Sequence, residues 1–295
     1  MRIVSLLPSA TEIVCALGLA DQLVGVTHEC DYPPAALAKA RVTSTALPPE
    51  ARTSRQIDDG INTLLDEAKS IYHLDLELLE RLQPDLILTQ ELCDVCAVAY
   101  AEVNRAAASV SSKPRVVSLE PNNLGQVLDS ILTVGQLTGA DASAEAYVAG
   151  LRRRLDALET PAGHRPRVYC MEWLDPPMRA GHWIPEMVQL AGGEESFANR
   201  DQPSTKTTWE DIRAYAPDVI VLMPCGFDLP RTLEEAATIQ EWPAKEVWAV
   251  NGSAYFSRPG PRLVDGVELL AHILGHTPPG FQDRALAKEC QRLLS

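Results

Sequence analysis

One short unit occurs once in each half of the chain. It is an amphipathic run that ends in a Pro-Asp pair and passes directly into an aliphatic strand, first over residues 74–88 and again over residues 207–221. Proline cannot continue a helix and disfavours the helical region for the residue before it, so each copy predicts a helix, a stop and a buried strand. The recurrence predicts two similar α/β lobes, with a cleft between them as a place for a ligand.

The elements expected around these units are those of an α/β protein with parallel sheets. Strand and helix patterns alternate from Arg2 to Asn123 and again after residue 160. Between them only helical periodicity remains, and a helix of roughly 30 Å that begins at Asp141 would be long enough to cross from one lobe to the other. Two segments are expected to be irregular, the turn Pro8–Glu12 and the stretch Arg41–Arg55.

These patterns set the expected domain boundaries. We predict an N-terminal α/β lobe at residues 1–123, a helical linker with the crossing helix at residues 124–160, and a C-terminal α/β lobe at residues 161–295. The last segment of that lobe, from residue 281, is predicted to be an amphipathic helix.

Composition excludes several classes of partner. A chain of 295 residues with 46% hydrophobic residues can fill two cores. Its formal net charge of -14 makes nucleic acid and anionic membranes poor partners. The short basic run Arg152–Arg154 is expected to be a solvated helix face. No stretch approaches the roughly 18 apolar residues of a membrane span, so membrane insertion is not expected.

The first residues and the cysteine count point to a cytoplasmic location. Residues 1–20 look superficially like a leader, but Pro8, Thr11 and Glu12 interrupt the apolar run and no Ala-x-Ala cleavage site precedes Asp21. Seven cysteines, an odd number, fit a reducing compartment better than a disulfide framework. We therefore expect a cytoplasmic protein, or a periplasmic or extracellular one if a leader has been removed.

Polar and aromatic residues follow the predicted strands. Because ligands bind beyond the carboxyl ends of strands in parallel α/β sheets, these residues form the candidate site. The set suits stacking against a flat or bulky ligand, whereas Trp209 and Trp242, beside helices, are expected to be structural. The candidates are Ser9, His28, Glu29, Asp31, Gln90, Glu91, Glu120, Glu172, Trp173, Asp175, His182, Trp183, Cys225, Tyr255 and Phe256.

Cys93-x-x-Cys96 is the sharpest local motif. Two thiols at this spacing could bind a metal or form a reversible disulfide, or they could be structural or contact a ligand. A zinc site needs two more ligands, which His28 and Cys30 could supply only if the fold brings their loop close. No nucleophile elbow, Walker loop, zinc-protease or dinucleotide motif occurs, so the sequence does not indicate an enzyme.

Several motifs together resemble a known family. They are Arg2–Ile13 at the first strand and helix, Val24–Thr27 followed by Asp31–Pro34, the two Pro-Asp units, Gln189–Gly193, and Tyr255–Arg262. In this order they resemble the class III, helical-backbone substrate-binding proteins of ABC importers for cobalamin, haem and iron-siderophores. Within that family these motifs are most similar in sequence to the cobalamin-binding branch.

The resemblance implies two Rossmann-like lobes with central parallel sheets, joined by one long helix, and a ligand held between the lobes. Such a protein requires no resident cofactor, has an ABC permease as its partner, and is expected to be a monomer. His28 could donate a nitrogen to cobalt or be a hydrogen-bonded loop residue. Carried over by position, the residues that would face the ligand are Ser9, Tyr32, Gln90, Trp173, Trp183, Tyr255 and Phe256.

Two hypotheses remain at this stage. The first is a non-enzymatic solute-binding protein that holds cobalamin or a related metal chelate for ABC-type import. The second is a cytosolic metal- or thiol-dependent protein on the same scaffold, which would use Cys93, Cys96, His28 and Cys30.

Overall fold

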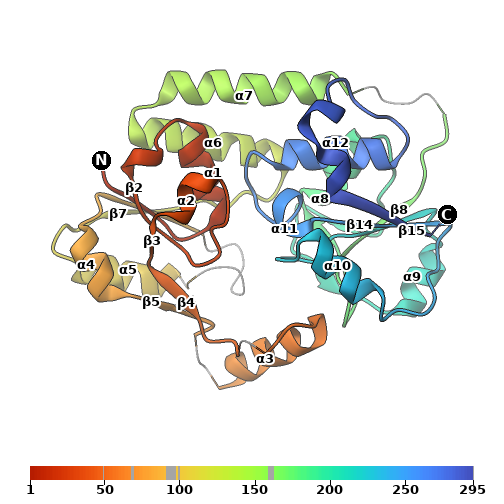
Figure 1. The fold of residues 1–295 in the computed structure, drawn as a ribbon, viewed down its shortest axis with the longest axis horizontal. Helices are drawn as coiled ribbons and strands as arrows, with labels where there is room; N and C mark the ends of the chain where they lie inside the picture. The colour runs from red at the N-terminus through yellow and green to blue at the C-terminus, as the bar shows by residue number, and fades with distance from the viewer. Residues whose placement is uncertain (49, 68–69, 91–97, 99, 159–162, 295) are drawn as a thin grey trace. The chain divides into compact units, whose positions relative to one another are not determined.

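The computed structural model describes residues 1–48, 50–67, 70–90, 98, 100–158 and 163–294. The chain forms two compact α/β units, which confirms the predicted fold class (Figure 1). Unit 1 contains Met1–Arg52, Gln56–Pro121 and Leu128–Val148, and unit 2 contains Thr53–Arg55, Asn122–Val127 and Ala149–Ser295.

Unit 1 is built on a sheet whose paired strands are all parallel, in the order β3-β2-β1-β6-β7. A separate antiparallel pair, β4 with β5, lies outside this sheet. The strands are β1 (Ile3–Ser5), β2 (Leu23–Val26), β3 (Ala40–Arg41), β4 (Thr43–Thr45), β5 (Tyr72–Leu74), β6 (Leu86–Thr89) and β7 (Arg115–Ser118). The helices are α1 (Pro8–Ala16), α2 (Pro34–Leu37), α3 (Ser54–Asp66), α4 (Leu76–Leu82), α5 (Tyr100–Ser109), α6 (Leu124–Thr138) and α7 (Asp141–Asp156), with a 3-10 turn at Ala20–Gln22.

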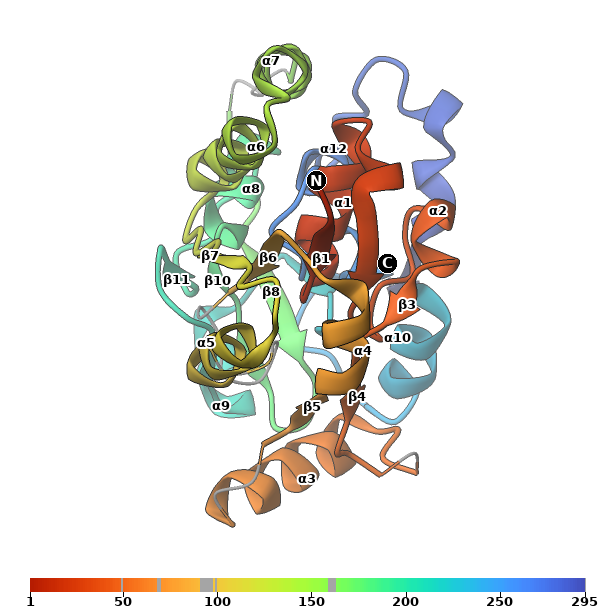
Figure 2. The same ribbon diagram turned by 90° about the vertical axis from the view of Figure 1, so that its left-hand side faces the viewer.

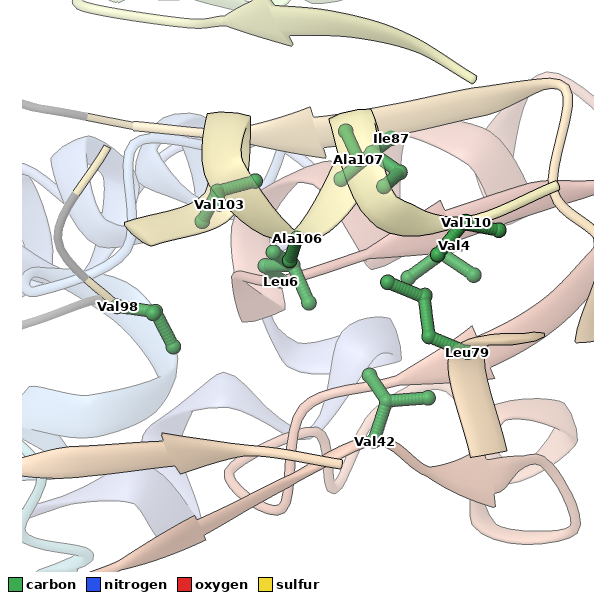
Figure 3. Close-up of a cluster of buried hydrophobic side chains, with 10 residues drawn as sticks. All are labelled: Val4, Leu6, Val42, Leu79, Ile87, Val98, Val103, Ala106, Ala107 and Val110. Atoms are coloured by element: carbon green, nitrogen blue, oxygen red, sulfur yellow. The ribbon is translucent and has the colours of Figure 1, made fainter. Parts of the chain in front are cut away.

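The two faces of the unit 1 sheet are covered by different helices. Alternate strand residues such as Val4 and Ile87 point to one face, where Leu79 of α4 and Val103 of α5 pack against them in a buried cluster (Figure 3). Helix α1 contacts β1 and β2 and contributes no residue to this cluster, so it covers the other face. Figure 2 shows α4 and α5 on one side of the strands and α1 on the other.

Unit 2 is built on a mixed sheet in the order β12-β9-β8-β13-β14-β15. The central strands β8, β13 and β14 are parallel, and the flanking strands run antiparallel. The strands of this sheet are β8 (Val168–Trp173), β9 (Met178–Arg179), β12 (Thr205–Lys206), β13 (Val219–Leu222), β14 (Glu246–Val250) and β15 (Cys290–Leu294), and a separate parallel pair is formed by β10 (Gly181–His182) and β11 (Asn199–Arg200). The helices are α8 (Ile184–Leu190), α9 (Trp209–Tyr215), α10 (Leu229–Ala236), α11 (Gly252–Tyr255) and α12 (Leu263–Ile273), with 3-10 turns at Gln282–Arg284 and Leu286–Glu289.

One face of the unit 2 sheet is covered by α9 and α10. Ile212 of α9 and Ala236 of α10 pack on Tyr169 and other alternate residues of the central strands. Trp209 and Trp242 pack on the same cluster with their rings 5.9 Å apart, which confirms that they are structural.

The two Pro-Asp units have the same geometry. In each, the helix ends on a residue with a left-handed backbone, Gln83 (φ 43°) after α4 and Ala216 (φ 49°) after α9. The proline of the unit directly follows this residue and excludes a further helical turn. The predicted sequence of helix, stop and buried strand is confirmed in both halves.

The aspartate of each unit fixes the start of the strand that follows. In unit 1 the Asp85 carboxylate accepts the Arg2 N–H at 2.7 Å, and the Arg2 carbonyl accepts the Asp85 N–H at 2.8 Å. In unit 2 the Asp218 carboxylate accepts the Arg167 N–H at 3.0 Å, and the Arg167 carbonyl accepts the Asp218 N–H at 2.8 Å. The same reciprocal contact therefore sets β6 beside β1 and β13 beside β8, in register.

Three helices, α3, α6 and α7, each contain residues of both units, whereas one crossing helix was predicted. The prediction that the arginine run on α7 is fully solvated is wrong for Arg154. Its guanidinium donates to Glu268 at 3.0 and 2.8 Å and to Asp265, both on α12. Burial disfavours the charged guanidinium, but the hydrogen bonds and charges of Glu268 and Asp265 outweigh it and raise the pKa of Arg154 above its ordinary value.

Three predicted elements are corrected by the structure. The terminal helix is wrong, because residues 290–294 form β15 and pair with β14, whose backbone groups would otherwise be an open sheet edge. Helix α1 begins at Pro8 rather than after a turn, since Leu7 is extended and a proline is tolerated in the first helical turn. The stretch Arg41–Arg55 is not irregular throughout, because it contains β4 and the start of α3.

Candidate functional site

The carboxyl ends of the parallel strands of unit 1 lie at one edge of its sheet. Strand β1 has β2 on one side and β6 on the other, so the connections leave it in opposite directions, which is where open α/β sheets bind ligands. Backbone pairing continues past the strand ends, with the Leu6 N–H donating to the Leu88 carbonyl at 2.9 Å. Ser9 in the first turn of α1 and Gln90 after β6 follow these two neighbouring strands.

Three side-chain oxygens at the end of β6 and β7 have no hydrogen-bond partner among the described residues. They are Thr89 Oγ1, Gln90 Oε1 and Ser118 Oγ, and Thr89 pairs with Ser118 in the sheet. Thr89 is 0% exposed and Gln90 is 6% exposed. A buried polar atom without a partner costs free energy, so this end of the sheet suits a ligand that brings polar groups of its own.

His28, after β2, is held as a loop residue. Its Nδ1 lies 2.8 Å from Thr43 Oγ1, and its backbone N–H donates to the same oxygen at 3.1 Å. The ring centroid lies 5.5 Å from that of Tyr72, and Nε2 lies 3.2 Å from a Glu29 carboxylate oxygen. Nδ1 therefore already faces a protein hydroxyl, whereas Nε2 lies near a carboxylate without a hydrogen-bond partner among the described residues, so His28 is held as a loop residue through Nδ1 and its backbone N–H.

The described residues do not assemble a metal site. Cys30 is buried, with its sulfur 3.1 Å from Thr11 Oγ1, so it packs against α1. Within residues 1–48, 50–67, 70–90, 98, 100–158 and 163–294, no group of three or more His, Cys, Asp or Glu side chains is placed to hold an ion. The predicted metal or thiol residues Cys93 and Cys96, with Glu91, lie outside the described residues. Tyr32, in the loop between β2 and α2, is 44% exposed to solvent.

In unit 2 the clearest aromatic group is at the end of β8. Trp173, the last residue of the strand, is half-buried, and its ring centroid lies 5.4 Å from that of Phe227, which follows β13. The Arg231 guanidinium lies 3.8 Å from the centroid of the Phe227 ring, a cation–π distance. The loops after β13 and β14 meet closely here, since a Cβ on Gly252 would lie 2.5 Å from the Pro224 carbonyl oxygen.

The other predicted aromatic residues of unit 2 differ in exposure. Tyr255 at the end of α11 is half-buried, with the Arg262 guanidinium 5.6 Å from its ring centroid. Trp183 is 4% exposed and donates its indole N–H to the Phe256 carbonyl at 2.8 Å, and Phe256 is 1% exposed. These two rings, predicted to face the ligand, are core side chains of unit 2 in this structure.

One carboxyl with a strongly raised pKa, Glu195, lies beside β8 rather than at the strand ends. Burial raises the pKa of the Glu195 carboxyl to about 7, against hydrogen bonds from the backbone N–H groups of Cys170, Phe197 and Ala198. Burial also lowers the pKa of His182, whose ring stacks on Trp183 at 5.3 Å. The Glu195 side chain therefore satisfies three backbone N–H groups of unit 2 by accepting a hydrogen bond from each.

Some residues at this edge were missed by the sequence reasoning. Ser54, from the stretch expected to be a loop, contacts Trp173 at the end of β8, and Arg55 contacts Asp175 in the loop that follows. Glu235 on α10 accepts hydrogen bonds from Ser54, 181 residues away in the chain. No local pattern signals contacts over such a separation. Arg258, which donates to Ser253 Oγ at 3.0 Å, lies within the motif Tyr255–Arg262 but was not predicted as a site residue.

Comparison with known proteins settles the family. The sequence profile of the family described as periplasmic binding protein matches residues 3–249. The chain belongs to this family. A "Vitamin B12-binding protein" of Vibrio cholerae is 25% identical over 285 residues, covering 90% of this chain and 86% of that protein. The prediction of a solute-binding role on a class III fold is confirmed, and the metal- or thiol-dependent alternative is not supported.

Two solved structures show the same fold. The periplasmic vitamin B12 binding protein of Vibrio cholerae superposes with a TM-score of 0.62 at 23% identity, covering 93% of this chain and 96% of that chain. A periplasmic heme binding protein from Pseudomonas aeruginosa gives a TM-score of 0.66 at 19% identity, covering 92% of each chain.

The expected cytoplasmic location is wrong. The family is one of periplasmic binding proteins, and both solved structures are described as periplasmic. The expectation relied on residues 1–20 and on the odd number of cysteines, but most of residues 1–20 form β1 and α1 of unit 1, so their sequence reflects the fold and does not decide the compartment. Among the described residues, no helix combines the length and apolar character needed to cross a bilayer.

Proposed function

We propose that this chain binds cobalamin or a related metal chelate, leaves it chemically unchanged, and passes it to an ABC permease. The proposal is supported by the 25% identical relative named for vitamin B12 binding, with which the match covers 90% of this chain. One structural observation carries it: a half-buried aromatic ring and a buried amide lie at the carboxyl ends of parallel strands, and a second half-buried ring lies at the end of α11, the helix that follows β14. They are Trp173 and Tyr255 in unit 2 and Gln90 in unit 1.

These groups suit the chemistry of a corrinoid. Such a ligand has a broad apolar face and amides around its rim, so rings can cover the face while Gln90 and Ser9 bond to the rim. We propose Ser9, Tyr32, Gln90, Trp173 and Tyr255 as ligand contacts. Trp183 and Phe256 would support these contacts from the core of unit 2, where they are 4% and 1% exposed.

A non-catalytic role is supported by the placement of the titratable groups. Glu195, with a pKa of about 7, is the kind of carboxyl that acid–base catalysis uses, yet its oxygens accept hydrogen bonds from three backbone N–H groups in the β8 layer. Glu195 therefore has a structural role. The proposed contacts are aromatic, amide and hydroxyl groups, which bind without transferring protons.

The proposal is tested by removing the Trp173 ring. A half-buried tryptophan that is covered by a ligand loses on the order of 80 Å² of apolar surface, worth about 2 kcal/mol, so Trp173→Ala should weaken cyanocobalamin binding about 30-fold. The matched control is Trp248→Ala, a half-buried tryptophan in β14 whose indole N–H donates to Glu246 at 3.3 Å. Equal affinities of the two variants in calorimetric titrations would contradict the proposed contact.

A further inference from the structure

A short segment from the N-terminal half of the chain is part of unit 2. Thr53–Arg55 belongs to unit 2, whereas the neighbouring residues Arg52 and Gln56 belong to unit 1. Ser54 is 0% exposed and is the one buried residue of α3. Ser54 is therefore the buried point at which this segment is attached to the rest of unit 2.

The attachment uses a buried carboxylate. The backbone N–H of Ser54 donates to Glu235 Oε1 at 2.9 Å, and the Ser54 hydroxyl donates to the same oxygen. Glu235 is only 9% exposed. Because Ser54 is the first residue of α3, the carboxylate of α10 accepts one of the free N–H groups at that helix end and faces the positive end of its dipole.

The same segment contacts the last residue of β8 and the loop that follows it. The Trp173 indole N–H donates to the Ser54 carbonyl at 3.2 Å. Two residues further on, the Asp175 carboxylate accepts from Arg55 Nε at 3.1 Å and from Nη2 at 2.5 Å, a bidentate pair. Two consecutive residues, Ser54 and Arg55, thus fix the indole N–H of Trp173 and the carboxylate of Asp175.

We propose that Thr53–Arg55 is a positioning segment that fixes the Trp173 ring for the ligand. The inference rests on the proposed function. Phe227 contacts the ring on one side at a centroid distance of 5.4 Å, which leaves rotation of the indole to be fixed by its hydrogen bond to Ser54. A ring held before binding loses less rotamer freedom when the ligand arrives, so the bound complex is tighter.

Whether Thr53–Arg55 fixes the Trp173 ring is tested in the absence of ligand. All five tryptophans are in unit 2, and fluorine NMR of the chain labelled with 5-fluorotryptophan gives each its own resonance, with that of Trp173 assigned from Trp173→Phe. Glu235→Ala and the independent variant Arg55→Ala should shift or broaden this resonance. The control Glu234→Ala, an exposed neighbour on α10, should leave it unchanged. An unchanged Trp173 resonance in both test variants overturns the inference.

The effect on binding is tested by cyanocobalamin titration in two backgrounds. With Trp173 present, Glu235→Ala should weaken binding about threefold to tenfold, the loss expected from one side chain that must be immobilised. In the Trp173→Phe background, which has no indole N–H, Glu235→Ala should change the affinity by less than about twofold. Equal weakening in both backgrounds, or no weakening in either, overturns the positioning role. Failure of the unmodified chain to bind cyanocobalamin instead overturns the proposed function, and the fluorine spectra then decide alone whether the segment holds the ring.

Discussion

Arg154 anchors the second half of α7 to α12, and replacing it with methionine should destabilise unit 2. The guanidinium makes three hydrogen bonds to the carboxylates of Glu268 and Asp265. The Glu268 side chain is 3% exposed and the Asp265 side chain is 20% exposed. Methionine keeps much of the apolar volume of the stem, so Arg154→Met removes mainly the charge and its donors.

The magnitude follows from what the change leaves behind. Removing one partner of a buried ion pair costs about 3–5 kcal/mol, because the other charge stays buried. Here the Arg284 guanidinium also forms an ion pair with Glu268 and lies 3.8 Å from an Asp265 carboxylate oxygen, so part of the charge compensation remains. We therefore expect Arg154→Met to lower the free energy of unfolding of unit 2 by about 2–3 kcal/mol, which shifts its melting temperature by roughly 5–10 °C.

Tryptophan fluorescence measures this change in unit 2 alone, because all five tryptophans lie there. The matched control is Arg152→Met, an exposed residue on the same helix, which should change the melting temperature by less than about 1 °C. Combining Arg154→Met with Glu268→Met should recover much of the loss, since the buried charge has then gone as well. Equal melting temperatures of the Arg152 and Arg154 variants would refute this account of the cluster.

Two further predictions concern unit 2. The Asp218 carboxylate accepts from the Lys245 ammonium and from the Arg167 N–H, and these contacts lower the pKa of Asp218. Asp218→Ala removes this acceptor and should lower the free energy of unfolding, measured with urea, by about 2 kcal/mol. The control Glu210→Ala, on the exposed surface of α9, should leave it almost unchanged. Burial raises the pKa of Glu195 from 4.5 to about 7, so the folded state keeps this proton to higher pH than the unfolded chain. The free energy of unfolding should therefore fall as pH rises between these values, by at most about 1.4 kcal/mol per pH unit, and a slope that persists in Glu195→Gln would contradict this assignment.

Local patterns predicted much of the fold. The Pro-Asp units, read as helix, stop and strand, were correct because proline acts on its immediate neighbours, and the structure adds the reciprocal contact of each aspartate. The terminal strand β15 was predicted as a helix. It forms a strand because it pairs with the otherwise open edge of β14, and no local sequence pattern reveals that edge.

The candidate site was predicted less completely. Residues after strands could be selected from the sequence, and Gln90 and Trp173 do lie at the carboxyl ends of parallel strands. The sequence could not separate a half-buried ring from a core ring, so Trp183 was grouped with Trp173 although it is 4% exposed. The contact of Ser54 with Glu235 joins residues 181 positions apart and arises only from the tertiary fold.

Titration of the purified chain with cyanocobalamin, haem and a ferric siderophore, followed by calorimetry and visible absorption, tests the central claim most directly. A solute-binding protein of this kind should bind one chelate with a single-site stoichiometry, and we expect cyanocobalamin to bind most tightly, since the relative that is 25% identical is named for vitamin B12 binding. Absence of binding for all three chelates up to about millimolar concentration, a free energy weaker than about -4 kcal/mol, would contradict the claim.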